Sequence, residues 1–202
     1  WTEEYKLTKE HYVNFIVALC DALELDDPIF MGSSFGGNVA LQLALRRPDR
    51  FKAVIPVEAA HYAPGFFLDW WHHPHVNAAQ VCASGTWDLM APQSPEMDRW
   101  LTWHYYTQGA EAFKGDLYFY SVDHDLREEL ERIDGRKCPV IMMTGTYDYL
   151  TTPEMTENTA RRIKGGVYIE MEDIGHFPMS ENYPVFKVYL KEALRIIRER
   201  KG

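Results

Sequence analysis

A serine, an aspartate and a histidine each lie in a loop that directly follows a predicted strand, in the chain order Ser34, Asp148 and His176. A serine hydroxyl is a weak nucleophile at neutral pH and needs a neighbouring base to become reactive. We expect Ser34 to attack a carbonyl carbon, and His176 to take the serine proton and later deliver it to the leaving group. Asp148 would hold the imidazole in one tautomer and stabilise its charged form.

Ser34 lies between Gly32 and Gly36 in GSSFG, which fits the pattern Gly-x-Ser-x-Gly. Residues 29–31 are an apolar run typical of a buried strand, and residues 37–45 carry apolar side chains at helical spacing. A sharp turn between the two would expose the serine. We expect both glycines to be needed there, because they lack the Cβ that a strained, closely packed turn excludes. On these five residues alone, an ordinary glycine-rich turn stays an alternative, whereas a phosphate-binding loop would need a lysine after the glycines.

Three histidines stand close together at positions 72, 73 and 75 and raise the question of a metal site. Zinc requires three or four ligands at fixed geometry. Pro74 interrupts helical spacing, and no paired cysteine or carboxylate accompanies the histidines. The sequence therefore predicts a polar, partly exposed segment here, with no metal and no cofactor.

The composition limits the class of protein. The chain has 202 residues, 46% of them apolar, which is enough for one domain with a sizeable core. A net charge of -9 argues against binding nucleic acid through a basic surface, and no apolar run is long enough to span a membrane. Three widely spaced cysteines without a C-x-x-C motif indicate reduced thiols and a cytoplasmic setting.

Strand and helix patterns alternate along the chain. Besides the strand before Ser34, strands are predicted over residues 51–57, 139–144 and 167–171. Helices are predicted over residues 8–23, after Ser34, from Thr152 to the glycines at 165 and 166, and from about Pro184. Such alternation predicts an α/β fold with a mostly parallel sheet flanked by helices. Functional residues are then expected at the carboxyl ends of the strands.

Residues 61–124 differ in character from the rest of the chain. They hold five of the six tryptophans and six of the eight histidines, and four prolines interrupt any long element. We interpret them as an inserted helical cap over the site. The core domain would then consist of residues 1–60 and 125–202. The tryptophans either pack the cap onto the core or line an apolar pocket.

Four stretches of the sequence together resemble the α/β-hydrolase superfamily, in its esterase-like branch of serine hydrolases. They are GSSFGG, RPDRF, CPVIMMTGTYDYLTTPE and GHFPMSENYP, which begin at residues 32, 47, 138 and 175. The resemblance implies that Ser34 is the nucleophile, Asp148 the acid and His176 the base. It also implies that the backbone N–H of Phe35 is one donor of an oxyanion hole.

Two residues near the predicted site have alternative roles. Glu58 ends the strand that follows the helix after Ser34, and some members of the superfamily place their acid at that position. Glu58 is therefore the alternative acid to Asp148. Ser33 is a neighbour of the nucleophile rather than a candidate itself, because its side chain lies one position off the apex of the turn.

One departure from the superfamily concerns the start of the chain. Members usually have strands and an oxyanion loop, often with the residues His-Gly, before the helix that opens this sequence. Residue 1 is Trp, and nothing upstream is available to supply the second oxyanion N–H. We expect that the N-terminal strands are missing from this chain and that it is the C-terminal portion of a longer hydrolase.

The resemblance implies a serine hydrolase that cleaves a carboxylic ester through an acyl-serine intermediate, without a cofactor. The expected substrate is a small molecule with an apolar or aromatic acyl part, and neither nucleic acid nor membrane is expected as a partner. The alternatives are a non-catalytic member that binds a small ligand, an acyltransferase and a hydrolase of carbon–carbon bonds. They stay open because function on this fold depends on the cap and the pocket.

Overall fold

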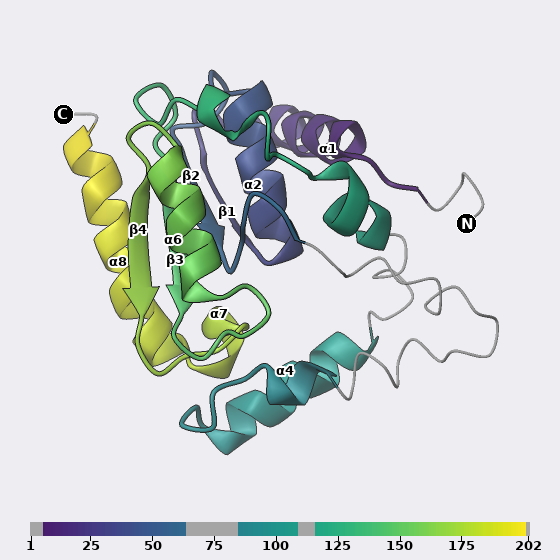
Figure 1. Ribbon diagram of the computed structural model, residues 1–202, viewed down its shortest axis with the longest axis vertical. Coiled ribbons are helices and arrows are strands. Elements are labelled where there is room, and N and C mark those ends of the chain that lie inside the picture. Colours follow the sequence, from purple (N-terminus) through teal and green to yellow (C-terminus); the bar gives the residue numbers. More distant parts are fainter. Residues whose placement is uncertain (1–5, 64–84, 109–115, 201–202) are drawn as a thin grey trace.

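A parallel four-stranded sheet forms the centre of the protein (Figure 1). The computed structural model describes residues 6–63, 85–108 and 116–200. The strands lie in the order β1-β2-β3-β4, all parallel. Their bounds are Ile29–Ser33, Ala53–Val57, Ile141–Gly145 and Val167–Met171. The predicted mostly parallel sheet is confirmed, and strand order follows chain order.

Alternate side chains of the two central strands face two separate apolar clusters, one on each face of the sheet. In β2, Ala53, Ile55 and Val57 belong to one cluster, whereas Val54 belongs to the other. Every residue of β2 and β3 is buried. Strands covered on both faces read as continuous apolar runs, which explains why the sequence showed them clearly.

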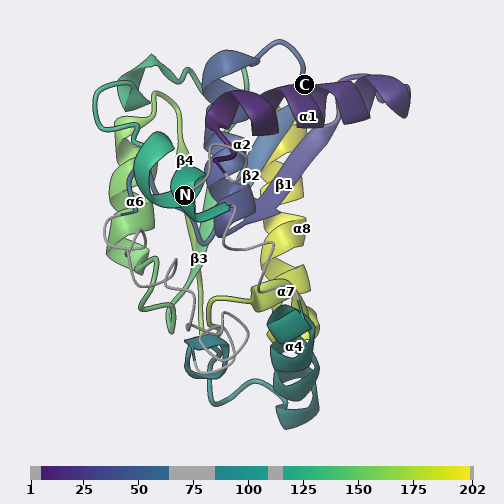
Figure 2. The same ribbon diagram turned by 90° about the vertical axis from the view of Figure 1, so that its right-hand side faces the viewer.

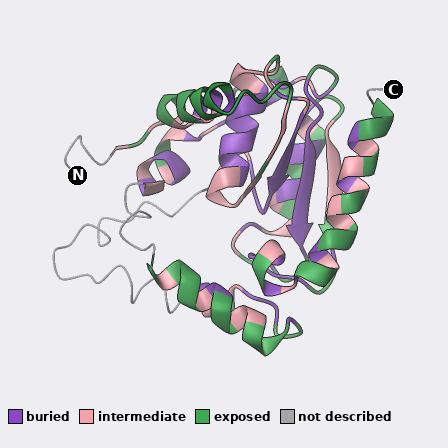
Figure 3. Ribbon diagram, turned by 180° about the vertical axis from the view of Figure 1, so that it is seen from behind, coloured by how far each residue is buried: buried purple, intermediate pink, exposed green. Residues whose placement is uncertain are grey.

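Helices cover both faces of the sheet. α1 (Lys9–Ala22), α2 (Phe35–Arg46) and α6 (Pro153–Arg162) supply buried residues to one cluster. α8 (Tyr183–Arg200) covers the other face with Phe186, Ala193 and Ile197, and its opposite side is exposed (Figure 3). The predicted helical spans agree with these bounds to within a few residues. The short α7 (Pro178–Glu181), which precedes α8, was not predicted.

The segment between β2 and β3 contains the helix α4 (Glu96–Gln108). α4 lies beyond the carboxyl ends of the strands and beside α7 in both views (Figures 1 and 2). A π-helical turn, η3 (Phe119–Asp123), and a 3₁₀ turn, η4 (Leu130–Arg132), follow it. Phe119 packs into the core cluster with α1 and α2. The domain boundaries at 61 and 124 stay predictions, and the histidines at 72, 73 and 75 lie outside the described residues.

Three expectations from the sequence concern the edge of the sheet, membrane-spanning helices and the cysteines. β1 is at one edge of the described sheet and is only partly buried, and the presence of further strands upstream stays a prediction. Within the described part of the chain, no helix combines the length and apolar character that crossing a membrane requires. Cys20 and Cys138 are buried thiols.

Candidate active site

Ser34 occupies a strained turn between β1 and α2. Its backbone has φ 53° and ψ -116°, a left-handed conformation that is rare for a residue with a side chain. The Ser34 N–H donates to Val57 O over 2.8 Å, and the Ser34 carbonyl accepts from Asn38 N in the first turn of α2. These bonds fix the turn between strand and helix, so the serine is presented at the carboxyl end of the sheet.

The turn needs glycine at Gly32 and Gly37. A Cβ on Gly32 would lie 2.1 Å from Gly36 O, and a Cβ on Gly37 would lie 2.6 Å from both Val57 O and the Ala59 side chain. A Cβ on Gly36 would meet nothing within 4 Å, and the φ of Gly36 is not positive. The expectation that Gly36 is sterically required is therefore wrong, because Gly37 and not Gly36 faces the neighbouring strand.

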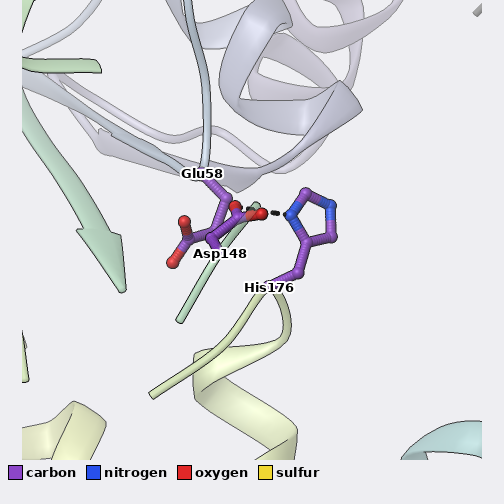
Figure 4. A group of neighbouring side chains, drawn as sticks. All are labelled: Glu58, Asp148 and His176. Atoms are coloured by element: carbon purple, nitrogen blue, oxygen red, sulfur yellow. Dashed lines mark hydrogen bonds and ion pairs between the residues drawn. The ribbon is translucent and has the colours of Figure 1, made fainter. Parts of the chain in front are cut away.

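The side chains of Ser34, His176 and Asp148 form one hydrogen-bonded chain. His176 Nε2 lies 2.8 Å from Ser34 Oγ, and His176 Nδ1 lies 2.7 Å from Asp148 Oδ2. Figure 4 shows the Asp148 carboxylate directed at the imidazole. His176 and Asp148 are each only 2% exposed. The structure thus brings together three residues that the sequence separates by up to 142 positions.

Asp148 is held as an anion by its surroundings. Its other oxygen, Oδ1, accepts the N–H groups of Leu150 and Thr151 over 2.8 and 3.0 Å. Burial opposes its ionisation, but the pKa of Asp148 is nevertheless below its ordinary value. Attraction to His176 and hydrogen bonds from His176, Glu58 and Thr151 together outweigh the burial.

Each strand of the sheet is followed, within five positions, by one residue of this site. Ser34 follows β1 immediately, Glu58 follows β2, Asp148 lies three residues past β3, and His176 lies five residues past β4. Because all four strands are parallel, their carboxyl ends meet at one edge of the sheet. This topology explains how loops far apart in sequence converge on one site.

Glu58 lies next to Asp148, and among the described residues the imidazole Nδ1 of His176 bonds to Asp148 and not to Glu58 (Figure 4). It is fully buried, and its Oε1 accepts the Gly145 N–H over 2.9 Å. Its Oε2 has no partner of standard hydrogen-bond geometry among the described residues. Burial first, and then the negative charge of Asp148, raise the pKa of Glu58 well above its ordinary value. The geometry favours Asp148 over Glu58 as the acid, and a neutral Glu58 beside it.

The same three side chains form a group that could hold a metal ion. One ligand atom from each of Glu58, Asp148 and His176 lies within 4.8 Å of the other two. However, His176 Nδ1 is already bonded to Asp148, and the raised pKa of Glu58 favours its neutral form, which is a poor metal ligand. The donor set therefore fits a hydrogen-bonded acid–base chain better than a cation.

Comparison with known proteins identifies the family. The sequence profile of the alpha/beta hydrolase family matches residues 2–186. The chain belongs to the α/β-hydrolase family. The fold expected from the sequence is confirmed by this match and by the parallel sheet flanked by helices.

The relatives of this α/β hydrolase are named as enzymes that act on different kinds of substrate. A 2-hydroxymuconate semialdehyde hydrolase of Pseudomonas sp. (strain CF600) is 36% identical over 52 residues, or 26% of this chain and only 18% of that protein. A pimeloyl-[acyl-carrier protein] methyl ester esterase of Neisseria meningitidis serogroup B is 27% identical over 186 residues, covering 85% of this chain and 70% of that protein. Among solved structures, an enol-lactonase from Burkholderia xenovorans LB400 superimposes with a TM-score of 0.80 at 21% identity, over 94% of this chain and 74% of that one. At this level of identity, the similarity to the enol-lactonase supports the fold alone.

Phe35 is positioned to present its backbone to the site of this hydrolase. It is the first residue of α2, so its N–H is among those that a helix leaves without an intrahelical partner. Its ring is fixed by edge contacts with Tyr12 at 4.7 Å and with Phe119 at 5.0 Å between centroids. A rigid N–H at a helix start is suited to an oxyanion, although the role of Phe35 stays a prediction.

Sequence reasoning missed two side chains that reach this site. Tyr120, from the π-helical turn η3, is buried, which raises its pKa, and hydrogen bonds with Ser34 and Thr151 oppose that rise. Glu181, from α7, bonds to the backbone on both sides of His176. Nothing in the sequence around Tyr120 signals this contact. Glu181 lies five residues after His176, and that proximity was the available signal.

Proposed function

We propose that this α/β hydrolase is a serine hydrolase that cleaves a carboxylic ester through an acyl-serine intermediate. The observation that carries the proposal is the continuous bonded chain from Ser34 Oγ through the imidazole of His176 to Asp148, at 2.8 and 2.7 Å. These distances are those that a nucleophile, its base and an orienting acid require. A protein that only bound a ligand in the same place would not need this arrangement.

In the first half of the proposed reaction, Ser34 Oγ attacks the ester carbonyl carbon while its proton passes to His176 Nε2. The negative charge that develops on the carbonyl oxygen is stabilised by the N–H of Phe35 and the positive end of α2. The carbon–oxygen bond to the alcohol then breaks, and the alcohol leaves with the proton from His176. Asp148 stabilises the imidazolium throughout this half.

In the second half, water replaces the alcohol. His176 takes a proton from the water as its oxygen attacks the acyl carbon, and then returns the proton to Ser34 Oγ as the bond to the serine breaks. The products are a carboxylic acid and the free enzyme, so no cofactor is consumed. If an alcohol took the place of water, the same steps would make a new ester, which is the acyltransferase alternative.

The choice of an ester with an apolar acyl part has two supports. One relative is named as a methyl ester esterase, which is a statement about that protein and only a guide to this one. In this chain, Tyr106 of α4 contacts the ring of Phe177, the residue after His176, with centroids 4.4 Å apart. A groove of about 540 Å³ is lined by Leu101, Tyr105 and Tyr106 together with polar residues, and none of Ser34, Asp148 and His176 is part of its lining. These side chains are suited to an apolar or aromatic acyl group.

The proposal can be tested with a matched pair of neighbouring serines. Wild-type protein should hydrolyse p-nitrophenyl esters and be labelled by a fluorophosphonate at Ser34, as mass spectrometry of the adduct peptide can establish. Ser34→Ala should lose the label and lower kcat/KM by a factor of about 10⁴ to 10⁶. Ser33→Ala is the control, because it removes a buried hydroxyl one residue away. Folded wild-type protein with no adduct and no ester turnover would contradict the proposal.

A further inference from the structure

One buried carboxylate holds the backbone of the loop that carries His176, residues 172–177, which we call the histidine loop. Glu181 is fully buried, and its Oε1 accepts the Gly175 N–H over 2.7 Å. Its Oε2 accepts the Phe177 N–H over 3.2 Å. The two amides that flank His176 therefore bond to the same side chain. The direction of the imidazole depends on this stretch of backbone, because the side chain of His176 leaves the chain between those amides.

The same carboxylate also bonds to the segment that precedes α4. Oε1 of Glu181 accepts a second bond from Ala91 N at 3.1 Å and a third from Ser94 Oγ at 2.9 Å. Leu89 O accepts the N–H of His176 itself over 2.9 Å. Glu181 is thus the point at which residues 89–94 and the histidine loop are joined, although 90 positions separate Glu181 from Ala91.

The two segments pack backbone against backbone at this point. A Cβ on Gly175 would lie 2.4 Å from Leu89 O and 2.7 Å from Ala91 N, so only glycine allows the approach. Backbone groups buried in this way must find hydrogen-bond partners. The Glu181 carboxylate supplies an acceptor for four donors at once, which is why a short polar side chain could not replace it.

Glu181 forms no salt bridge within the described part of the chain, so its four donors must offset the desolvation of its oxygens. A fully satisfied buried network of this kind makes the groups that it joins rigid. A carboxylate bonded to surface loops would do nothing for catalysis, but two of the four residues that donate to Glu181, Gly175 and Phe177, flank His176. The network is therefore placed to set the geometry of the site.

We infer that Glu181 is a positioning residue for His176, and that it makes the reach of the imidazole to Ser34 depend on the docking of residues 89–94. This inference rests on the proposed function, since it assigns Glu181 a part in the serine hydrolase reaction. It assigns no contact between Glu181 and substrate. Correct placement of His176 is then set both by the loop after β4 and by the chain segment before α4.

The test compares Glu181→Gln with Ser94→Ala and with the control Glu172→Gln, which neutralises an exposed carboxylate near the same loop. In Glu181→Gln the amide N–H₂ would face the N–H of Phe177 or another donor, so at least one bond is lost. Rates are expressed per Ser34 titrated with fluorophosphonate, so that unfolded molecules do not count. We expect kcat for Glu181→Gln to fall about 10- to 100-fold with KM changed less than about threefold. Ser94→Ala should show a smaller loss of kcat, and Glu172→Gln none.

A second readout requires no substrate. Amide hydrogen exchange of a peptide spanning residues 172–182 should be at least about tenfold faster in Glu181→Gln than in wild-type protein, because at least one of the donors at Gly175 and Phe177 loses its acceptor. Unchanged exchange there, or a lower melting temperature with unchanged kcat per titrated serine, would overturn the inference. If Glu181→Gln does not fold, kcat per titrated serine is read from Ser94→Ala, which removes one of the donors to Glu181, and an unchanged kcat there would overturn the inference. A wild-type protein without serine reactivity would count against the proposed function, while the exchange result would still decide the role of Glu181.

Discussion

Replacing Glu58 with glutamine should make the protein progressively more stable than wild type as the pH rises. Glu58 is fully buried beside Asp148, and burial and the Asp148 charge raise its pKa well above the ordinary value of 4.5. The folded state therefore keeps a proton that the unfolded state releases. Glutamine has the shape of that neutral acid. Its oxygen can accept from Gly145 N, and its N–H₂ can face Asp148.

The sign and size of the effect follow from linkage. A carboxyl whose folded pKa is raised contributes its full stability below the unfolded pKa, and that contribution is lost as the pH rises through the folded pKa. One such group makes the wild-type free energy of unfolding fall by about 1.4 kcal/mol for each pH unit in that window. Glutamine does not titrate, so the difference between the two proteins should grow at that slope and then level off.

The assay is urea denaturation followed by tryptophan fluorescence at one-unit steps from pH 5 to pH 9. Glu172→Gln is the control, because Glu172 is exposed and should give a curve parallel to wild type. The kcat/KM of Glu58→Gln should stay close to wild type, since Asp148 and not Glu58 bonds to the imidazole. Curves for wild type and Glu58→Gln that run parallel from pH 5 upward would refute the argument that Glu58 is buried as a neutral acid.

Three further predictions concern neighbouring groups. Asp148→Asn should lower kcat by a factor of about 10⁴, and retention of activity in a p-nitrophenyl ester assay would instead favour Glu58 as the acid. Gly32→Ala should destabilise the fold by roughly 3 kcal/mol or more, because the new Cβ would collide with the backbone of Gly36. Gly36→Ala should be neutral or stabilising by up to about 1 kcal/mol, because its Cβ would meet nothing within 4 Å. Thermal or urea unfolding of the two variants tests this difference. His124 is fully buried, and burial lowers its pKa to about 4 from 6.5, so stability should be lost as the pH falls through that window, by about 3 kcal/mol in all. The free energy of unfolding of His124→Asn should not show this additional fall between pH 6.5 and 4. The same fall in wild type and variant would contradict the assignment of His124 as the group that causes it.

The parts of the fold that sequence predicted are those set by local pattern. The apolar runs of β2 and β3 and the helical spacing in α2 and α6 depend on which neighbouring residues must be buried together. Pro153 after Thr152 marks the start of α6, and the Thr152 hydroxyl does accept the N–H of Met155 there. The positions of Ser34, Asp148 and His176 after strands followed from the same patterns. Their convergence required only that the strands be parallel.

The parts that sequence did not predict depend on contacts between distant segments. Gly36 and Gly37 are adjacent and chemically identical, and only the approach of Val57 and Ala59 shows which of them must lack a side chain. Tyr120 reaches Ser34 through a π-helical turn, for which the sequence has no reliable pattern. No spacing rule pairs Glu181 with a backbone amide 90 residues away.

The two buried glutamates of this site differ in what surrounds them, and that difference predicts opposite responses to the same substitution. Among the described residues, Glu58 accepts one hydrogen bond, from Gly145 N, and Asp148 is its anionic neighbour, so a neutral side chain of the same shape suits its position. Glu181 accepts hydrogen bonds from four donors among the described residues, so an amide that can accept at only one of its two ends leaves a donor unpaired. Glutamine should therefore be tolerated at position 58 and harmful at position 181. The number of donors that converge on a buried carboxyl, rather than its distance from Ser34, decides how much the site depends on its charge.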